Sequence, residues 1–194
     1  MDKKKILLIN LSKGRLGELN SSLIGLILVG KLLIASLSRT DIPEATRSDF
    51  YFYIDEFQNV TTPSIATILS EARKYRLDLI ISHQFIGQLE ENIKKAVFGN
   101  VGSMVSFRIG SEDGEFLEKQ FMPVFNAHDL INIDNYNCYV KLLINGQTSE
   151  PFNMKTAYLQ KQESVLIEKI KELSRVKYGR PREDIEAEIL KKHM

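Results

Sequence analysis

Apolar and polar residues alternate in blocks through the first two thirds of the chain. Short continuous apolar runs predict strands buried on both faces, and apolar residues at helical spacing predict the helices between them. The expected strands are residues 5–11, 50–54, 77–82 and 103–109, and the expected helices are residues 21–38, 63–75 and 89–98. This alternation predicts an α/β fold in which right-handed helical crossovers join parallel strands.

The pattern changes after about residue 110. A helix over residues 112–121 is expected to end before Pro123. Two strand-like runs, residues 137–144 and 148–156, flank Asn145-Gly146, a pair of residues that favours a tight hairpin turn. The sequence therefore predicts a β-hairpin after the alternating region.

From Gln160 the chain is charged and helical in its spacing, and a last helix can begin at Pro181. The apolar positions are Leu166, Ile170 and Leu173 on one stripe of the first helix, and Ile185 and Ile189, expected to point inward, in the second. We expect two parts: residues 1–157, and a charged helical extension over residues 158–194.

Composition excludes several classes of protein. The 194 residues are 43% hydrophobic and 26% charged, as in soluble globular proteins, which excludes collagen-like and wholly disordered chains. The 26 Lys and Arg residues nearly cancel the 25 Asp and Glu residues, so any surface that binds anions must be local. The single cysteine, Cys138, excludes an intramolecular disulfide and favours a cytosolic setting.

The longest apolar stretch, residues 23–37, is expected to be a buried helix capped by Asn20, Ser21 or Ser22. It falls short of the roughly 18 apolar residues typical of a membrane span. Its residues 25–32 have the Gly-x4-Gly-Lys spacing of a phosphate loop, but Leu32 stands where the Mg²⁺-binding Ser or Thr belongs. Because the intervening residues are all apolar and lie inside the helix, we conclude that the chain has no phosphate loop.

Polar side chains follow the expected strands, at the edge where open parallel sheets bind ligands. They are Ser12, Lys13, Gly14 and Arg15 after the first strand, Asp55 and Glu56 after the second, His83 and Gln84 after the third, and Arg108 near the end of the fourth. Each alone is an ordinary loop residue. Together they favour a nucleotide site, with Lys13 and Arg108 as its cations.

Five β-forming residues end directly in Asp55-Glu56, which is the Walker B pattern. The first carboxylate can hold Mg²⁺ through its water shell and the second can polarise an attacking water. The alternative is that both residues cap the next element. The amide of Gln84 can sense a terminal phosphate or orient the water, or it is simply the neighbour of a helix cap.

Arg73 ends the helix between the second and third strands. A cation there suits the helix dipole. The functional alternative is an arginine that reaches into a neighbouring subunit's site and stabilises phosphoryl charge.

Several motifs in order resemble one family: residues 5–18, 53–59, 70–77, 81–85, 98–110 and 178–183. They are similar to the C-terminal half of the TraG/TraD-like coupling ATPases of conjugation and type IV secretion, which are related to the HerA-like DNA translocases. The resemblance implies a RecA-like P-loop NTPase motor that forms a hexameric ring and pumps single- or double-stranded DNA. It implies ATP and Mg²⁺ as cofactors, and a relaxase and type IV secretion components as partners.

The resemblance also implies roles for residues. Asp55 matches the Walker B metal residue, Glu56 the catalytic glutamate, Gln84 the glutamine that senses the γ-phosphate, and Arg73 the arginine presented in trans. Arg108 is similar to an arginine near the nucleotide. The phosphate loop, its strand and any membrane helices would lie upstream of Met1, so we expect a cytoplasmic position at the inner face of the membrane.

The sequence thus looks like the back half of a motor, whether as a fragment, a truncated reading frame or half of a split gene. By itself we expect it to be inactive as an ATPase, to expose strand edges and to self-associate. The competing hypothesis is a non-hydrolytic DNA-binding or interaction module derived from this motor fold. Retention of Asp55, Glu56, Gln84 and Arg73 favours the enzyme, whereas the missing phosphate loop favours the inactive module.

Overall fold

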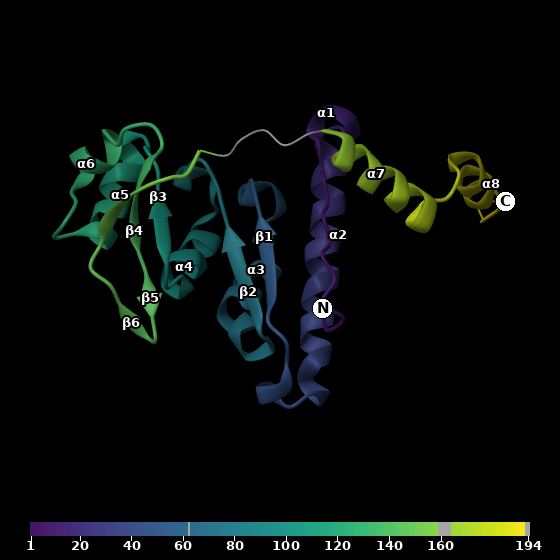
Figure 1. The fold of residues 1–194 in the computed structure, drawn as a ribbon, viewed down its shortest axis with the longest axis horizontal. Helices are drawn as coiled ribbons and strands as arrows, with labels where there is room; N and C mark the ends of the chain where they lie inside the picture. The colour runs from purple at the N-terminus through teal and green to yellow at the C-terminus, as the bar shows by residue number, and fades with distance from the viewer. Residues whose placement is uncertain (62, 159–163, 193–194) are drawn as a thin grey trace. The chain divides into compact units, whose positions relative to one another are not determined.

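The computed structural model describes residues 1–61, 63–158 and 164–192 (Figure 1). The chain divides into two compact units, Met1–Thr156 and Ala157–Met194. The helices of the first unit are α1 (Lys13–Leu16), α2 (Glu18–Leu37), α3 (Pro63–Glu71), α4 (Glu91–Asn100), α5 (Ser111–Phe121) and α6 (Ala127–Ile131). Its strands are β1 (Phe50–Ile54), β2 (Leu77–Ile81), β3 (Met104–Ser106), β4 (Asn137–Lys141), β5 (Leu143–Ile144), β6 (Gln147–Thr148) and β7 (Phe152–Lys155).

The strands β1 and β2 form a parallel pair in which Ile54 lies opposite Ile81. Helix α3 and a 3-10 turn, Ala72–Tyr75, make the crossover between them. Figure 1 shows β1 and β2 side by side. The two strands and the crossover helix are therefore confirmed at nearly the expected residues.

Apolar side chains from the helices and strands build a first core. Its buried members are Val29, Ile54, Phe57, Val60, Ile65, Ile68, Leu77, Leu89, Ile93 and Val97. They come from α2, β1, the segment after β1, α3, β2, the segment before α4, and α4. The two-stranded sheet therefore lies among three helices. This packing anchors both strands of the parallel pair.

A second, antiparallel sheet has the order β3-β4-β7, and β5 and β6 pair at its end. Asn145 and Gly146 take positive φ values of 51° and 79° at the turn, which confirms the predicted hairpin. Beside it a second core contains Ile86, Leu117, Phe121, Leu130 and Ile133. Phe98 of α4 packs against both cores.

The prediction of a mostly parallel sheet is wrong in its extent. The expected fourth strand is only Met104–Ser106, and it pairs antiparallel with β4 rather than parallel with β2. The hairpin strand β4 offers a complete antiparallel ladder to β3, whereas nothing in the described residues joins β3 to β2. The fold is still α/β, with one parallel pair.

The first predicted strand, residues 5–11, is also absent: the structure assigns no strand before β1. Because a strand exists only through its hydrogen-bonded neighbour, this apolar run lies exposed, with Ile6 at 88% and Leu8 at 81% of full exposure. The segment instead lines a cavity of about 1310 Å³ together with residues of α2 and β1.

Helix α2 begins at Glu18, so its N-cap is Gly17, three to five residues before the expected caps. The side chains predicted as caps bond elsewhere: the Ser21 hydroxyl donates to the Leu11 carbonyl at 2.5 Å, and Asn20 Nδ2 donates to the Leu16 carbonyl at 2.9 Å. The residues with phosphate-loop spacing all lie inside α2 as regular helix. This confirms that they do not form a loop around a phosphate.

The segment Glu18–Asp41 is long and apolar enough to cross a membrane by length and composition, contrary to the expectation from residues 23–37. Only 22% of its most apolar window is buried. Leu19 and Ile34, for example, lie exposed on its surface. A core helix of a soluble protein meets the same criteria, and Val29 does enter the first core.

The second unit contains α7 (Ser164–Tyr178) and α8 (Arg182–Lys192). All side chains described in these two helices are exposed, including the stripe of Leu166, Ile170 and Leu173. Ile185 and Ile189 are exposed as well, so the expectation that they point inward is wrong for the described structure. The predicted helical start at residues 160–163 lies outside the described residues.

Two glycines of α2 provide a test of its packing. A Cβ at Gly25 would lie 2.5 Å from Val60 Cγ1 and 3.3 Å from Leu11 Cδ1, whereas a Cβ at Gly30 would meet no atom within 4 Å. Gly25→Ala is expected to lower the free energy of unfolding by about 1–3 kcal/mol through overpacking. Gly30→Ala should raise it by up to about 1 kcal/mol through helix propensity. Urea denaturation of both variants checks this, and equal stability of the two would contradict the packing of Val60 on α2.

Candidate functional site

The carboxyl ends of β1 and β2 form the candidate site. Asp55 and Glu56 follow β1, and Ser82, His83 and Gln84 follow β2. Two backbone hydrogen bonds continue the pairing beyond the strands: Ser82 N donates to Ile54 O, and Phe57 N donates to Ser82 O, both at 2.9 Å. The parallel register therefore brings the predicted carboxylates and the predicted glutamine to one edge of the sheet.

Asp55 is exposed at the end of β1, and one of its carboxylate oxygens is fully engaged. Oδ1 accepts hydrogen bonds from the Ser82 hydroxyl at 2.5 Å and from Glu56 N at 3.0 Å. Such bonds to a charged acceptor are stronger than those between neutral groups and hold the side chain in one orientation. Oδ2 makes no hydrogen bond among the described residues, so it can face a cation.

Glu56 is held from two sides. Its Oε1 accepts a hydrogen bond from Gln84 Nε2 and its Oε2 accepts one from Gln58 Nε2, each at 2.6 Å. The residue has φ 51° and ψ 48°, a left-handed conformation that costs a non-glycine residue energy and is found often at functional sites. The contact with Gln84 joins the two residues that the sequence singled out.

His83 lies beside Gln84 but points into the protein, and its buried Nδ1 has no hydrogen-bond partner among the described residues. Burial lowers the pKa of His83, and this effect outweighs the influence of the Phe85 backbone and of the nearby charge of Asp113, which both raise the pKa. The neutral imidazole is therefore the form that the fold favours.

Lys13 is connected to the site by a contact with the turn that follows Glu56. Its Nζ donates to Asn59 Oδ1 and to Glu18 Oε1, both at 3.0 Å. Lys13, Asp55, Glu56 and Asn59 all line the cavity beside β1. Most of the remaining lining side chains are apolar, so we regard the cavity as the gap beside an unpaired strand edge. The polar groups at its end are the candidate site.

Arg73 lies away from the carboxyl ends of the strands, and Arg108 makes its hydrogen bond to the segment before β4. Arg73 is exposed in the 3-10 turn before β2, at the edge of the sheet where the strands begin. Five residues of β2 separate the two edges, about 17 Å at the rise of a strand. Arg108 Nη2 donates to Asn135 Oδ1 at 3.1 Å, beside the second sheet. The structure thus does not bring Arg73 to Glu56 within one chain.

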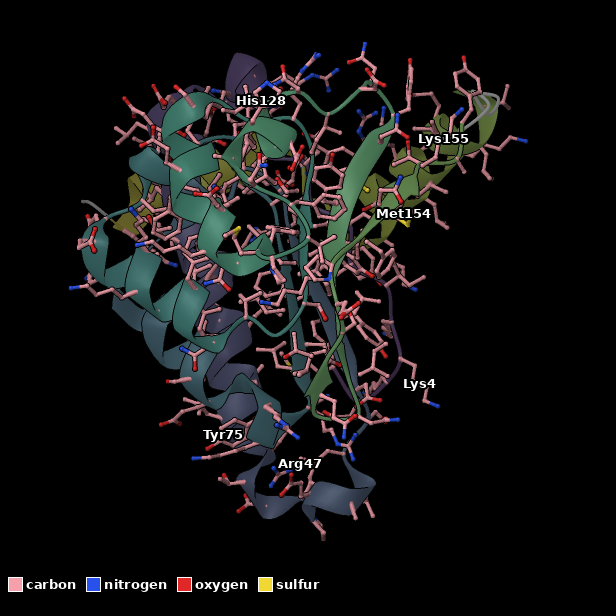
Figure 2. The ribbon with its side chains drawn as sticks, turned by 90° about the vertical axis from the view of Figure 1, so that its left-hand side faces the viewer. Lys4, Arg47, Tyr75, His128, Met154 and Lys155 are labelled. Carbon is pink, nitrogen blue, oxygen red and sulfur yellow. The ribbon has the colours of Figure 1, made fainter. Side chains whose placement is uncertain are left out.

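A group of basic and aromatic residues occupies the edge where β1 and β2 begin. Figure 2 shows Arg47 and Tyr75 close together there, with the guanidinium 5.5 Å from the centre of the ring. Nearby, the buried Arg39 donates from Nη1 to the Tyr75 carbonyl at 2.7 Å, and its Nη2 lies 2.8 Å from Asp2 Oδ1. These contacts fix the start of β2 against α2 and have no part in the candidate site.

Ser82, Gln58 and Asn59 belong to the polar network and were missed from the sequence. Ser82 could have been found, because a register that pairs Ile54 with Ile81 sets Asp55 beside Ser82. Gln58 and Asn59 lie in a 3-10 turn, Phe57–Val60, whose geometry depends on the left-handed Glu56. No periodic pattern in the sequence signals that turn.

The candidate site offers carboxylate oxygens from Asp55 and Glu56 at one edge of the sheet. Mg²⁺ prefers oxygen ligands and commonly takes one or two carboxylates together with water and phosphate oxygens. In residues 1–61, 63–158 and 164–192, no group of three or more His, Cys, Asp or Glu side chains could hold a metal alone. A cation at Asp55 would therefore depend on ligands from the nucleotide and water.

Comparison with known proteins finds similarity over part of the chain. Residues 49–119 match the family model described as the TraM recognition site of TraD and TraG. No curated protein matches significantly. Among solved structures, the unbound bacterial conjugative coupling protein TrwBdeltaN70 has a TM-score of 0.54 and 16% identity, covering 66% of this chain and 36% of its own.

Two further TrwB structures contain nucleotides. The complex with the non-hydrolysable ATP analogue ADPNP has a TM-score of 0.56 and 16% identity, over 72% of this chain and 38% of its own. The complex with ADP and Mg²⁺ has a TM-score of 0.53 and 17% identity, over 66% and 35%. The chain spans little more than a third of the length of these structures. It has the fold of part of their RecA-like domain and resembles the C-terminal part of the TraG/TraD-like coupling proteins, as recognised from the sequence.

His83 gives a prediction about stability and pH. Because its pKa is lower in the folded than in the unfolded protein, the unfolded chain binds more protons as the pH falls through the ordinary histidine pKa near 6.5. The His83 contribution to the free energy of unfolding should thus be present above that pH and decline as the pH falls from about 7.5 to 5. Denaturant unfolding of wild type and His83→Gln at several pH values in this range measures the contribution as the difference between their free energies of unfolding. Parallel pH profiles would contradict the burial of a neutral imidazole.

Proposed function

We propose that this chain is the C-terminal part of an ATP-driven DNA translocase, a coupling protein of a conjugative type IV secretion system. The observation that carries the proposal is the pair of contacts at the strand ends, Glu56 with Gln84 and Asp55 with Ser82. A carboxylate held by an amide next to a second carboxylate suits phosphoryl transfer to water. The resemblance to coupling proteins and the nucleotide complexes of TrwB support the same reading.

In this proposal bound Mg-ATP supplies the electrophilic terminal phosphate, with its charge partly neutralised by the cation. Asp55 would hold the cation or its water shell through Oδ2, because its Oδ1 accepts the hydrogen bond from Ser82. Glu56 polarises the attacking water and accepts its proton on a carboxylate oxygen. Gln84 holds Glu56 in the waiting state and turns its amide to the terminal phosphate or the water when nucleotide binds. Lys13 and Arg108 are the candidate cations for phosphate groups.

The described residues supply only one side of such a site. Cradling phosphates requires a run of backbone amides, usually from a glycine-rich loop at a helix start. The glycines of α2 lie inside regular helix, so they do not supply it. We therefore propose that an upstream segment of the same motor provides the phosphate loop, and that hydrolysis requires both parts.

The proposed partners follow from the same family. TraD and TraG contain a TraM recognition site in the region that matches residues 49–119. We propose a TraM-like protein, the relaxase and the type IV secretion components as partners, and DNA in the channel of a hexameric ring. Such a motor would lie at the cytoplasmic face of the membrane.

The alternative function is a non-hydrolytic module that binds DNA or partner proteins. One observation favours it: no phosphate loop lies in these 194 residues. The DNA upstream of this reading frame discriminates between the two. An in-frame Gly-x4-Gly-Lys followed by Ser or Thr supports the motor, and its absence from the neighbouring DNA supports the module.

The main test replaces Glu56 by Gln in the protein that combines this chain with its phosphate loop. Turnover should fall by about 100-fold or more, because the general base is lost, while Mg-ATP binding stays within a few-fold of wild type. Steady-state hydrolysis and nucleotide binding by calorimetry measure the two effects. The exposed Glu112→Gln, which removes a carboxylate outside the site, serves as the matched control. Turnover near wild type in Glu56→Gln would remove Glu56 from the mechanism.

Arg73 is expected to act across a subunit boundary, since it lies at the far edge of its own sheet from Glu56. Arg73→Ala assemblies should lose most turnover while still forming rings of normal size. Mixing Arg73→Ala subunits with Glu56→Gln subunits should restore part of it, because some interfaces then pair an intact Glu56 with an intact Arg73. Full activity of assembled Arg73→Ala alone would show that the arginine has no such role. Lys74→Ala, at the next position, is the control.

A further inference from the structure

The loop that carries Gln84, residues 82–86, is held at both of its ends. At the start, Ser82 bonds through its backbone to Ile54 and Phe57 of the β1 segment. At the other end, Ile86 N donates a hydrogen bond to Asp113 Oδ2 at 3.1 Å. Gln84 lies between these two anchors, so its position depends on both.

Asp113 is an unusual anchor because its charged side chain is almost fully enclosed. Only 9% of the residue is exposed, although it lies in the first turn of α5. The positive end of the helix dipole stabilises a carboxylate there, and its hydrogen bond to Ile86 N is buried. An enclosed bond to a charged acceptor is strong, and losing the acceptor would leave the Ile86 amide unpaired.

Helix α5 also holds Ile86 through its side chain. Ile86 is 4% exposed and packs in the second core with Leu117 and Phe121 of the same helix. Phe85, between Gln84 and Ile86, has an extended backbone with φ −134° and ψ 124°. A shift of α5 is therefore carried through Ile86 and the extended Phe85 to Gln84, whose amide contacts Glu56.

We propose that Asp113 is a positioning residue for Gln84: by fixing the Ile86 end of the loop, it sets the Gln84–Glu56 contact and links that contact to α5. The inference rests on the proposed function, because the contact it controls is the one we assign to ATP turnover. The effect of Asp113 on the loop can also be tested in the 194-residue chain without an activity assay.

The first experiment uses the chain itself. Hydrogen exchange of the segment 82–89 is compared in wild type, Asp113→Ala, Asp113→Asn and Glu112→Ala. Asp113→Ala should raise exchange in this segment by about tenfold or more while the segment 50–57 stays protected, since only the second anchor is lost. Asp113→Asn keeps an acceptor oxygen and should remain close to wild type, as should Glu112→Ala on the exposed side of the same turn. Unchanged exchange in Asp113→Ala overturns the proposal.

The second experiment measures turnover in the protein that includes the phosphate loop. Asp113→Ala should lower kcat by about 10- to 100-fold, the range expected when a catalytic group is misplaced, with the KM for Mg-ATP within twofold. Asp113→Asn should restore most of the loss. In a Gln84→Ala background, Asp113→Ala should cause no further loss, because Asp113 acts through Gln84.

The outcomes separate the two ideas. Additive losses from Gln84→Ala and Asp113→Ala, or a change confined to KM, overturn the positioning role and leave the proposed function intact if Glu56→Gln is inactive. Full turnover in Glu56→Gln removes Glu56 from the mechanism and overturns the catalytic part of this inference, whereas hydrogen exchange alone decides whether Asp113 fixes the loop. If Asp113→Ala does not fold, Asp113→Ser replaces it. Serine keeps a polar group at this position, but its side chain is too short to accept the hydrogen bond from Ile86 N.

Discussion

The parallel register of β1 and β2 is the constraint on which the candidate site depends. With Ile54 opposite Ile81, the next backbone bonds fall on Ser82 and Phe57, and the side chains of Asp55 and Ser82 meet. A slip by one residue would turn each side chain of one strand to the opposite face. The buried ends of both strands, Ile54 and Leu77, resist such a slip because each belongs to the first core.

The direction of the strands also separates two kinds of chemistry. Carboxylates and amides gather where β1 and β2 end, while Arg47, Arg76 and the buried Arg39 gather where the strands begin. The guanidinium groups there are bound in place: Arg76 pairs with Asp49 at 3.2 Å, and Arg39 and Arg47 bond to backbone carbonyls. An arginine at this edge can therefore contact the site at the carboxyl ends of β1 and β2 only if that site belongs to a second molecule.

Local patterns in the sequence predicted the elements well and their pairing less well. The apolar run Phe50 to Ile54 and the Asn145-Gly146 turn carry their own conformational preference, so β1 and the hairpin are where they were expected. Pairing over longer distances depends on partners that a local pattern does not name. For this reason residues 5–11 have strand-like sequence without a strand, and β3 joins the hairpin instead of β2.

In the site, Asp55, Glu56 and Gln84 were recognisable because each follows a strand. Ser82 and Gln58 were not, since their place follows from the register and from the left-handed Glu56.

The exposed helices α7 and α8 have a consequence for how the chain melts. Isolated helices of this length are marginal in water, and the described side chains of these two bury nothing that could compensate. Their support comes from surface ion pairs such as Arg182–Glu186 and Lys192–Glu188, which salt screens. Helicity in this segment should then be lost gradually and without a heat-capacity step, because no apolar surface becomes newly hydrated. A calorimeter therefore reports on the two cores alone, while circular dichroism sums a cooperative transition and a non-cooperative one.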